Sequence, residues 1–179
     1  KKDIKSKTDL EKIKPDNNSH YAFVRSLLQH ELQIRNNLEN YSRVRNNHYF
    51  SNLLSLFCLR VILYQPSDAR TRDLSRLIEM IDDELNIQVY HDGVSFEGST
   101  NYHFVMYEML VHIVYIAKLY SIKLPISFFR KLRDMRSFLY AIRTPEFNYP
   151  LIGDNDSGRL MIYAQYFTRR KSDFSVYDK

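Results

Sequence analysis

Two short polar segments of the sequence contain the residue types of acid–base chemistry. One reads Arg-Asn-Asn-His over residues 45–48, and the other reads Asn-Tyr-His over residues 101–103. Histidine and tyrosine side chains can transfer protons, and asparagine and arginine can donate hydrogen bonds to an anion. Each segment directly precedes an apolar run with helical spacing, so both are predicted to lie at helix N-termini.

The two segments precede the second and fourth of five predicted helices. Because short loops join these helices into antiparallel hairpins, alternate helices run in the same direction. The N-termini of the second and fourth helices should then lie on the same face of the domain. We therefore expect Asn47, His48, Tyr102 and His103 to converge there.

A purely structural interpretation fits the same segments. Asparagine is a favoured helix N-cap, so Asn46 or Asn47 suits the start of the second helix, and Thr100 or Asn101 suits the start of the fourth. The Tyr-His pair would then be half-buried, with one hydrogen bond each. On these patterns alone both interpretations stay open.

Apolar residues recur at three- and four-residue spacings through most of the chain. This periodicity predicts helices over about residues 21–38, 49–64, 68–85, 102–120 and 125–139. Ser67 would cap the third helix, and Pro125 suits the first turn of the fifth. With only four glycines and few alternating β-branched residues, no large sheet is expected, and the predicted fold class is all-α.

The remaining segments lack a helical period. Asp92-Gly93 predicts a turn before the fourth helix, and residues 144–159 have the composition of a loop. Residues 160–167 fit either a short strand or a short helix. Residues 1–19 are Lys-rich and are predicted to form a basic N-terminal arm, which leaves residues 20–179 as one helical domain.

The composition is that of a basic globular domain. Its 179 residues, 44% of them hydrophobic, are enough for one core. The formal net charge of +5 favours an anionic partner, which could be a polysaccharide, a nucleic acid or a membrane surface. No recognised nucleic-acid motif is present, and the arginine clusters are more typical of solvated helix faces, so no nucleic-acid partner is expected.

Cysteine content and hydropathy limit the function further. Cys58 is the single cysteine, so it cannot form an internal disulfide, and its apolar surroundings predict a buried core residue. No stretch reaches the roughly 20 apolar residues of a membrane span, and no apolar core follows the Lys-rich start, as a signal peptide would need. We therefore expect no membrane span.

Three motifs occur in a characteristic order. They are "RNNHYFSNLLSLFCL" from residue 45, "DGVSFEGSTNYHF" from residue 92, which continues to the Leu-Pro before the fifth helix, and "PLIGDNDSGR" from residue 150. In order, spacing and residue type they resemble the N-terminal helical domain of heparinase II/III-like polysaccharide lyases, a family that includes alginate and heparan sulfate lyases. The resemblance covers about residue 21 to the C-terminus.

This resemblance implies an α/α toroid, here incomplete, which in the family is followed by a β-sandwich domain. No such domain follows within these residues, so we expect a fragment with part of an active site. Activity of the fragment alone stays open, as does self-association through faces that the sandwich would cover. The resemblance also favours a periplasmic, secreted or cell-envelope location.

The implied activity is β-elimination across the C4–C5 bond of uronic acids in an acidic polysaccharide. By resemblance, Asn47 and His48 match the residues that bind and neutralise the uronate carboxylate. Tyr102 matches the catalytic acid or base, and His103 follows it as in the family. Abstraction of a proton next to a carboxylate builds a second negative charge, which hydrogen-bond donors would stabilise.

Four neighbouring residues are expected to contact the substrate or to support this cluster: Arg45, Asn46, Glu97 and Asn101. A cation such as Arg45 could favour the phenolate of the catalytic tyrosine. Many relatives carry an acidic residue shortly after the Asn-His pair, where this chain has Asn52, so the partner that orients the histidine is not evident. No metal or cofactor is expected.

Two functions other than a lyase also fit the sequence. One is a non-catalytic domain that binds acidic glycans or serves as a scaffold in polysaccharide assembly, and it would bind without turnover. The other is a basic helical nucleic-acid binder, which would require tight and steeply salt-dependent affinity.

Overall fold

The computed structural model describes residues 17–40, 45–63, 68–146, 148–155 and 160, and this part of the chain contains five helices and no strand. The helices are α2 (Asn17–Asn36), α3 (Asn47–Leu63), α4 (Asp68–Gln88), α5 (Thr100–Leu119) and α6 (Ile126–Ile142). The only pairing of strand type in these residues is an isolated antiparallel bridge between Val89 and Ser95. The predicted all-α class is confirmed, while the toroid stays a prediction.

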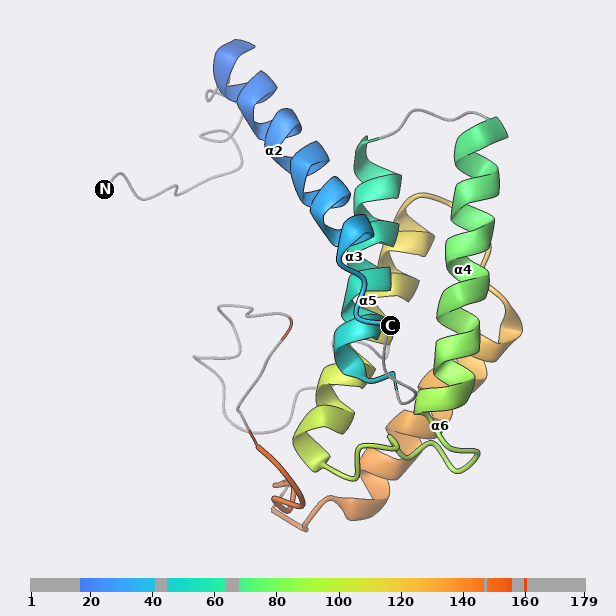
Figure 1. Cartoon of the computed structure of the whole chain (residues 1–179). Helices are drawn as coiled ribbons and strands as arrows, with labels where there is room; N and C mark the ends of the chain where they lie inside the picture. Colours follow the sequence, from blue (N-terminus) through green and yellow to red (C-terminus); the bar gives the residue numbers. More distant parts are fainter. Residues whose placement is uncertain (1–16, 41–44, 64–67, 147, 156–159, 161–179) are drawn as a thin grey trace, which may run out of the picture.

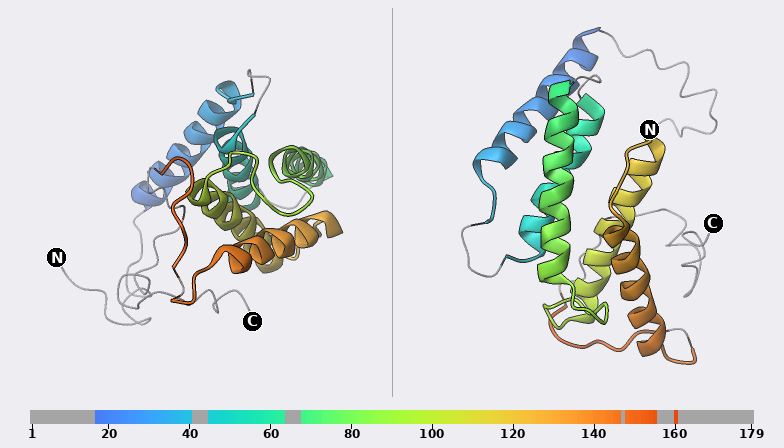
Figure 2. Two further views of the ribbon diagram at one scale, coloured as in Figure 1. Left: turned by 90° about the horizontal axis from the view of Figure 1, so that it is seen from below. Right: turned by 90° about the vertical axis from the view of Figure 1, so that its right-hand side faces the viewer.

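The helices alternate in direction, as the hairpin argument predicted. Figure 1 shows α3 and α5 running one way and α4 and α6 running the other. Helix α3 packs against α2, α4 and α5, and α6 packs against α4 and α5. In both views of Figure 2, α2 lies along one side of the bundle and α6 lies on another. The N-termini of α3 and α5 therefore lie at the same end of the bundle.

The core forms mainly between α3, α5 and the helices that cover them. Phe50 and Phe57 of α3, Leu110 and Ile113 of α5 and Met135 of α6 are all fully buried. Burying a large apolar side chain contributes about 1.5–3 kcal/mol relative to leaving it exposed. Helix α3 is central in this packing, and the core fixes the two helix starts that carry the polar segments.

The helix starts differ in detail from the sequence prediction. Helix α5 begins at Thr100, and its N-cap is Ser99, whose backbone is extended. The Ser99 Oγ accepts the Tyr102 N–H at 3.2 Å. The cap is therefore not Thr100 or Asn101, because Thr100 already has helical geometry. At α3, the Asn46 Oδ1 accepts the His48 N–H at 3.1 Å. Asn46 therefore caps this helix and is the correct one of the two predicted caps, Asn46 and Asn47.

Several predictions fall at or beyond the described ranges. Helix α2 begins at Asn17, inside the segment expected to be the N-terminal arm. The predicted cap Ser67 and residues 161–167 lie outside the described residues.

None of the helices in the described part is both long and apolar enough to cross a membrane. Large apolar side chains on α2, such as Tyr21 and Phe23, are exposed, and self-association through such faces stays a prediction.

Candidate active-site cleft

A shallow, open cleft lies where the N-termini of α3 and α5 meet the loop before α5. Its volume is about 410 Å³. It is lined by Asn46, Asn47, His48, Phe96, Glu97, Tyr102 and Asp154. These residues come from segments up to about a hundred positions apart, so the cleft is a product of the helix packing.

Asn47 and Glu97 join the start of α3 to the loop before α5. The Glu97 carboxylate accepts the Asn47 backbone N–H at 2.9 Å, and it accepts the Asn47 Nδ2 at 2.9 and 2.8 Å through its two oxygens. A carboxylate only accepts, so these contacts orient the amide with Nδ2 toward Glu97. Two oxygens of one carboxylate lie too close together to take both amide hydrogens in line. One N–H is shared between them, and the other can donate to a ligand.

His48 contacts a carboxylate from outside the cleft. Its Nδ1 lies 3.0 Å from Oε2 of Glu39, a residue in the segment after α2. The backbone N–H of Glu39 donates to Oδ1 of Asn52 at 2.9 Å. The sequence interpretation noted Asn52 but missed Glu39, because nothing in its local pattern points to a histidine nine residues later.

Tyr102 enters the cleft from the first turn of α5. The Ser99 cap accepts its backbone N–H, which fixes where the helix starts and so where the tyrosine projects. Asn47, His48 and Tyr102 therefore line one cleft, as the direction argument predicted.

The loop after α6 supplies a further carboxylate, Asp154. Thr100 anchors this loop, since its N–H donates to the Ile152 carbonyl at 3.0 Å and its Oγ1 accepts the Ile152 N–H at 2.9 Å. Gly153 has φ +72, and a Cβ there would lie 2.7 Å from the Gly98 carbonyl oxygen. Asp154 was missed as a site residue, although it lies within the third motif.

The family of the chain follows from comparison with family models. The model described as "Heparinase II/III N-terminus" matches residues 12–177, which is most of the chain. The chain belongs to this family. Comparison with curated proteins and with solved structures finds no further match. Membership relates this helical domain to the polysaccharide lyases.

In this heparinase II/III N-terminal domain, Arg45 contacts α4. Its Nε lies 2.8 Å from Oε1 of the buried Glu84, and its guanidinium stands 5.6 Å from the centre of the Tyr49 ring. Burial and the Glu84 carboxylate raise the pKa of Tyr49, while Arg45 lowers it. Gln88 donates from Nε2 to Glu84 and to the Asn46 carbonyl, at 2.9 and 3.0 Å. These contacts hold the start of α3 against the end of α4.

His103 lies in the core instead of the cleft. It is 1% exposed, its Nδ1 accepts the Ser95 N–H at 3.2 Å, and its Nε2 lies 3.1 Å from the Met135 carbonyl oxygen. These partners assign the neutral tautomer with the proton on Nε2. Burial lowers the pKa of His103 to about 4, against a smaller raising effect of the bond to Met135. His103 therefore ties the loop before α5 to α6.

Two other features complete the site. Asn101 is half-buried and is not among the residues that line the cleft. In the described part of the chain, no group of three or more His, Cys, Asp or Glu side chains could hold a metal ion. The cleft presents amide, imidazole, phenol and carboxylate groups from the residues that line it.

Proposed function

We propose that this chain is the helical domain of a polysaccharide lyase that cleaves a uronic-acid polysaccharide by β-elimination. The observation that carries the proposal is the meeting of Asn47, His48 and Tyr102 in one open cleft of a heparinase II/III N-terminal domain. An open cleft suits a polymer, because the chain can enter from the side and extend beyond the residues at the reacting bond.

The difficult step is removal of the C5 proton, which lies next to the uronate carboxylate. The electrons of the C5–H bond delocalise into that carboxylate, which acquires a second negative charge. The second N–H of the Asn47 side-chain amide, which does not point at Glu97, donates to the uronate carboxylate, and the Nε2–H of His48 is the other donor. Preorganised donors of this kind can each contribute about 3 kcal/mol to the stability of the transition state.

Tyr102 is the proposed proton-transfer residue. Elimination is completed when the electrons form the C4–C5 double bond and the bond from C4 to the glycosidic oxygen breaks. Where the C5 hydrogen and the departing oxygen lie on the same face of the sugar ring, the Tyr102 phenolate takes the C5 proton, and the phenol that results gives that proton to the departing oxygen. Where they lie on opposite faces, the Tyr102 phenol protonates the departing oxygen and a second base on the other face takes the C5 proton.

The remaining cleft residues have supporting roles in this proposal. Glu97 orients Asn47, since both of its oxygens accept from the Asn47 amide. Asn46 caps α3 and thereby sets the position of the two residues after it. Arg45 contributes through its pairing with Glu84 and through the packing of α3 on α4.

The test is to incubate the protein with a panel of polysaccharides and follow ultraviolet absorbance. Both the 179-residue chain and the complete gene product are assayed on alginate, heparan sulfate and hyaluronan, with a neutral glucan as control. A lyase produces an unsaturated uronate that absorbs, from at least one acidic polymer and not from the glucan. Binding of acidic polymers by both forms without any new absorbance would contradict the lyase and favour a glycan-binding or scaffold domain.

A further inference from the structure

The carboxylate that contacts His48 lies outside the cleft. We propose that Glu39 is a positioning residue, which holds a proton on Nδ1 of His48 and so reserves Nε2 for the substrate. This inference rests on the proposed function and adds a residue that the three motifs do not contain.

The contact itself determines which nitrogen carries the proton. An ionised carboxylate can only accept, so a contact of 3.0 Å between Nδ1 and the Glu39 Oε2 requires a hydrogen on Nδ1. The hydrogen stays there whether the ring is neutral or protonated. His48 lines the cleft and Glu39 does not, and no described residue bonds Nε2. Nε2 is therefore the nitrogen that donates to a ligand or takes a proton from it.

Glu39 is held in place by α3 itself. Its backbone N–H donates to Oδ1 of Asn52 at 2.9 Å, and Asn52 lies four residues after His48, on the same side of the helix. This hydrogen bond holds the segment after α2 beside the first turn of α3. The Asn52 amide thus holds the backbone of Glu39, and Glu39 places its carboxylate against the His48 ring.

Stability does not account for this pair. The side chains of His48 and Glu39 are 56% and 41% exposed, and ion pairs with such exposure contribute at most about 1 kcal/mol to folding. Replacing Glu39 should therefore leave the fold intact while changing which nitrogen of the His48 ring carries the proton. The proton position can then be measured in a folded variant, without relying on activity.

The first test measures the tautomer of neutral His48 by ¹⁵N NMR of the 179-residue chain, with the signal assigned by its loss in His48→Gln. We expect mainly the Nδ1–H form in the wild type and in Glu39→Asp. Glu39→Ala should shift the population to mainly Nε2–H, since no side-chain acceptor is then left at Nδ1. The matched control is Glu79→Gln, which removes an exposed carboxylate on α4 and should leave the tautomer unchanged. An unchanged tautomer in Glu39→Ala overturns the inference.

The second test measures kcat and KM on whichever uronate polymer is cleaved. Glu39→Gln should lower kcat at least about tenfold with KM changed little, Glu39→Asp should recover much of the loss, and Glu79→Gln should match the wild type. A wild-type kcat in Glu39→Gln would refute the positioning role. Absence of turnover in the wild type would instead count against the proposed function, and the NMR result would still decide which nitrogen Glu39 protonates.

Discussion

The two helix starts of the cleft carry similar residues, yet their histidines have opposite environments. His48 is the second residue of α3, lies in the cleft and contacts an exposed carboxylate. His103 is the fourth residue of α5, is fully buried and bonds two backbone groups. Each helical residue advances about 100°, so second and fourth positions lie about 200° apart around a helix. Position relative to the cap therefore decides which histidine meets solvent and which joins the core.

The largest difference between the two histidines should appear in activity. His48→Gln should lower kcat about 100- to 1,000-fold, because it removes the ring that we propose binds the uronate carboxylate. Its free energy of unfolding should stay within about 0.5 kcal/mol of the wild type, since the side chain is exposed. The measurements are turnover by ultraviolet absorbance and urea denaturation. A variant that loses stability as well as activity would show that His48 is part of the fold.

His103 should instead make stability depend on pH. The unfolded chain binds this proton below about pH 6.5, whereas burial lowers the pKa of the folded state to about 4. The contribution is therefore fully present above pH 6.5 and is lost as the pH falls through 4, with a size of about 3 kcal/mol.

The control for this pH effect is His103→Gln. A glutamine can accept from Ser95 and donate to Met135 but does not titrate, so this component of the pH dependence should disappear in urea denaturation at pH 7, 5.5 and 4. An identical pH dependence in the wild type and His103→Gln would contradict the assignment.

The smallest of these effects concerns the link between the two helix starts. Glu97→Gln replaces a carboxylate that accepts from both the backbone and the side chain of Asn47. We expect a loss of about 1–2 kcal/mol in unfolding free energy and about a tenfold loss of kcat, because the Asn47 amide is no longer held in one orientation. Full activity with reduced stability would make Glu97 a purely structural contact.

The features that sequence predicted are those set by local patterns. Helical periodicity located the five helices, and their alternating direction was enough to bring Asn47, His48 and Tyr102 to one cleft. The features that it missed depend on contacts between distant segments. His103 is buried because α6 supplies the Met135 carbonyl 32 residues later, and Asp154 reaches the cleft because Thr100 binds a loop more than 50 residues away. No local signal encodes such contacts.

Glu39 is an intermediate case. It lies only nine residues before His48, but between them the chain leaves one helix and starts another. Helical spacing rules apply within one element, so they could not pair these two residues.

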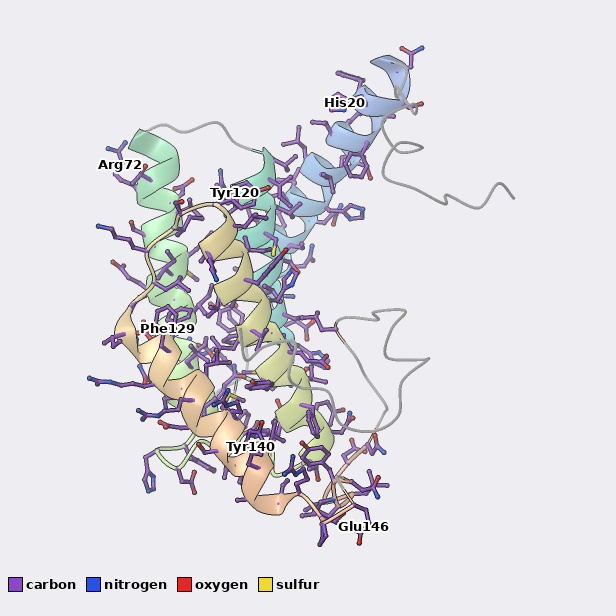
Figure 3. The ribbon with its side chains drawn as sticks, turned by 180° about the vertical axis from the view of Figure 1, so that it is seen from behind. His20, Arg72, Tyr120, Phe129, Tyr140 and Glu146 are labelled. Atoms are coloured by element: carbon purple, nitrogen blue, oxygen red, sulfur yellow. The ribbon has the colours of Figure 1, made fainter. Side chains whose placement is uncertain are left out.

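The central claim is that Tyr102 transfers a proton in a β-elimination at this cleft. Its most direct test compares Tyr102→Phe with Tyr120→Phe, which removes the same hydroxyl from an exposed tyrosine at the other end of α5 (Figure 3). The assay is the ultraviolet absorbance of unsaturated uronate released by the complete protein. We predict that Tyr102→Phe lowers the rate at least about 100-fold while Tyr120→Phe matches the wild type. A wild-type rate in Tyr102→Phe would contradict the claim.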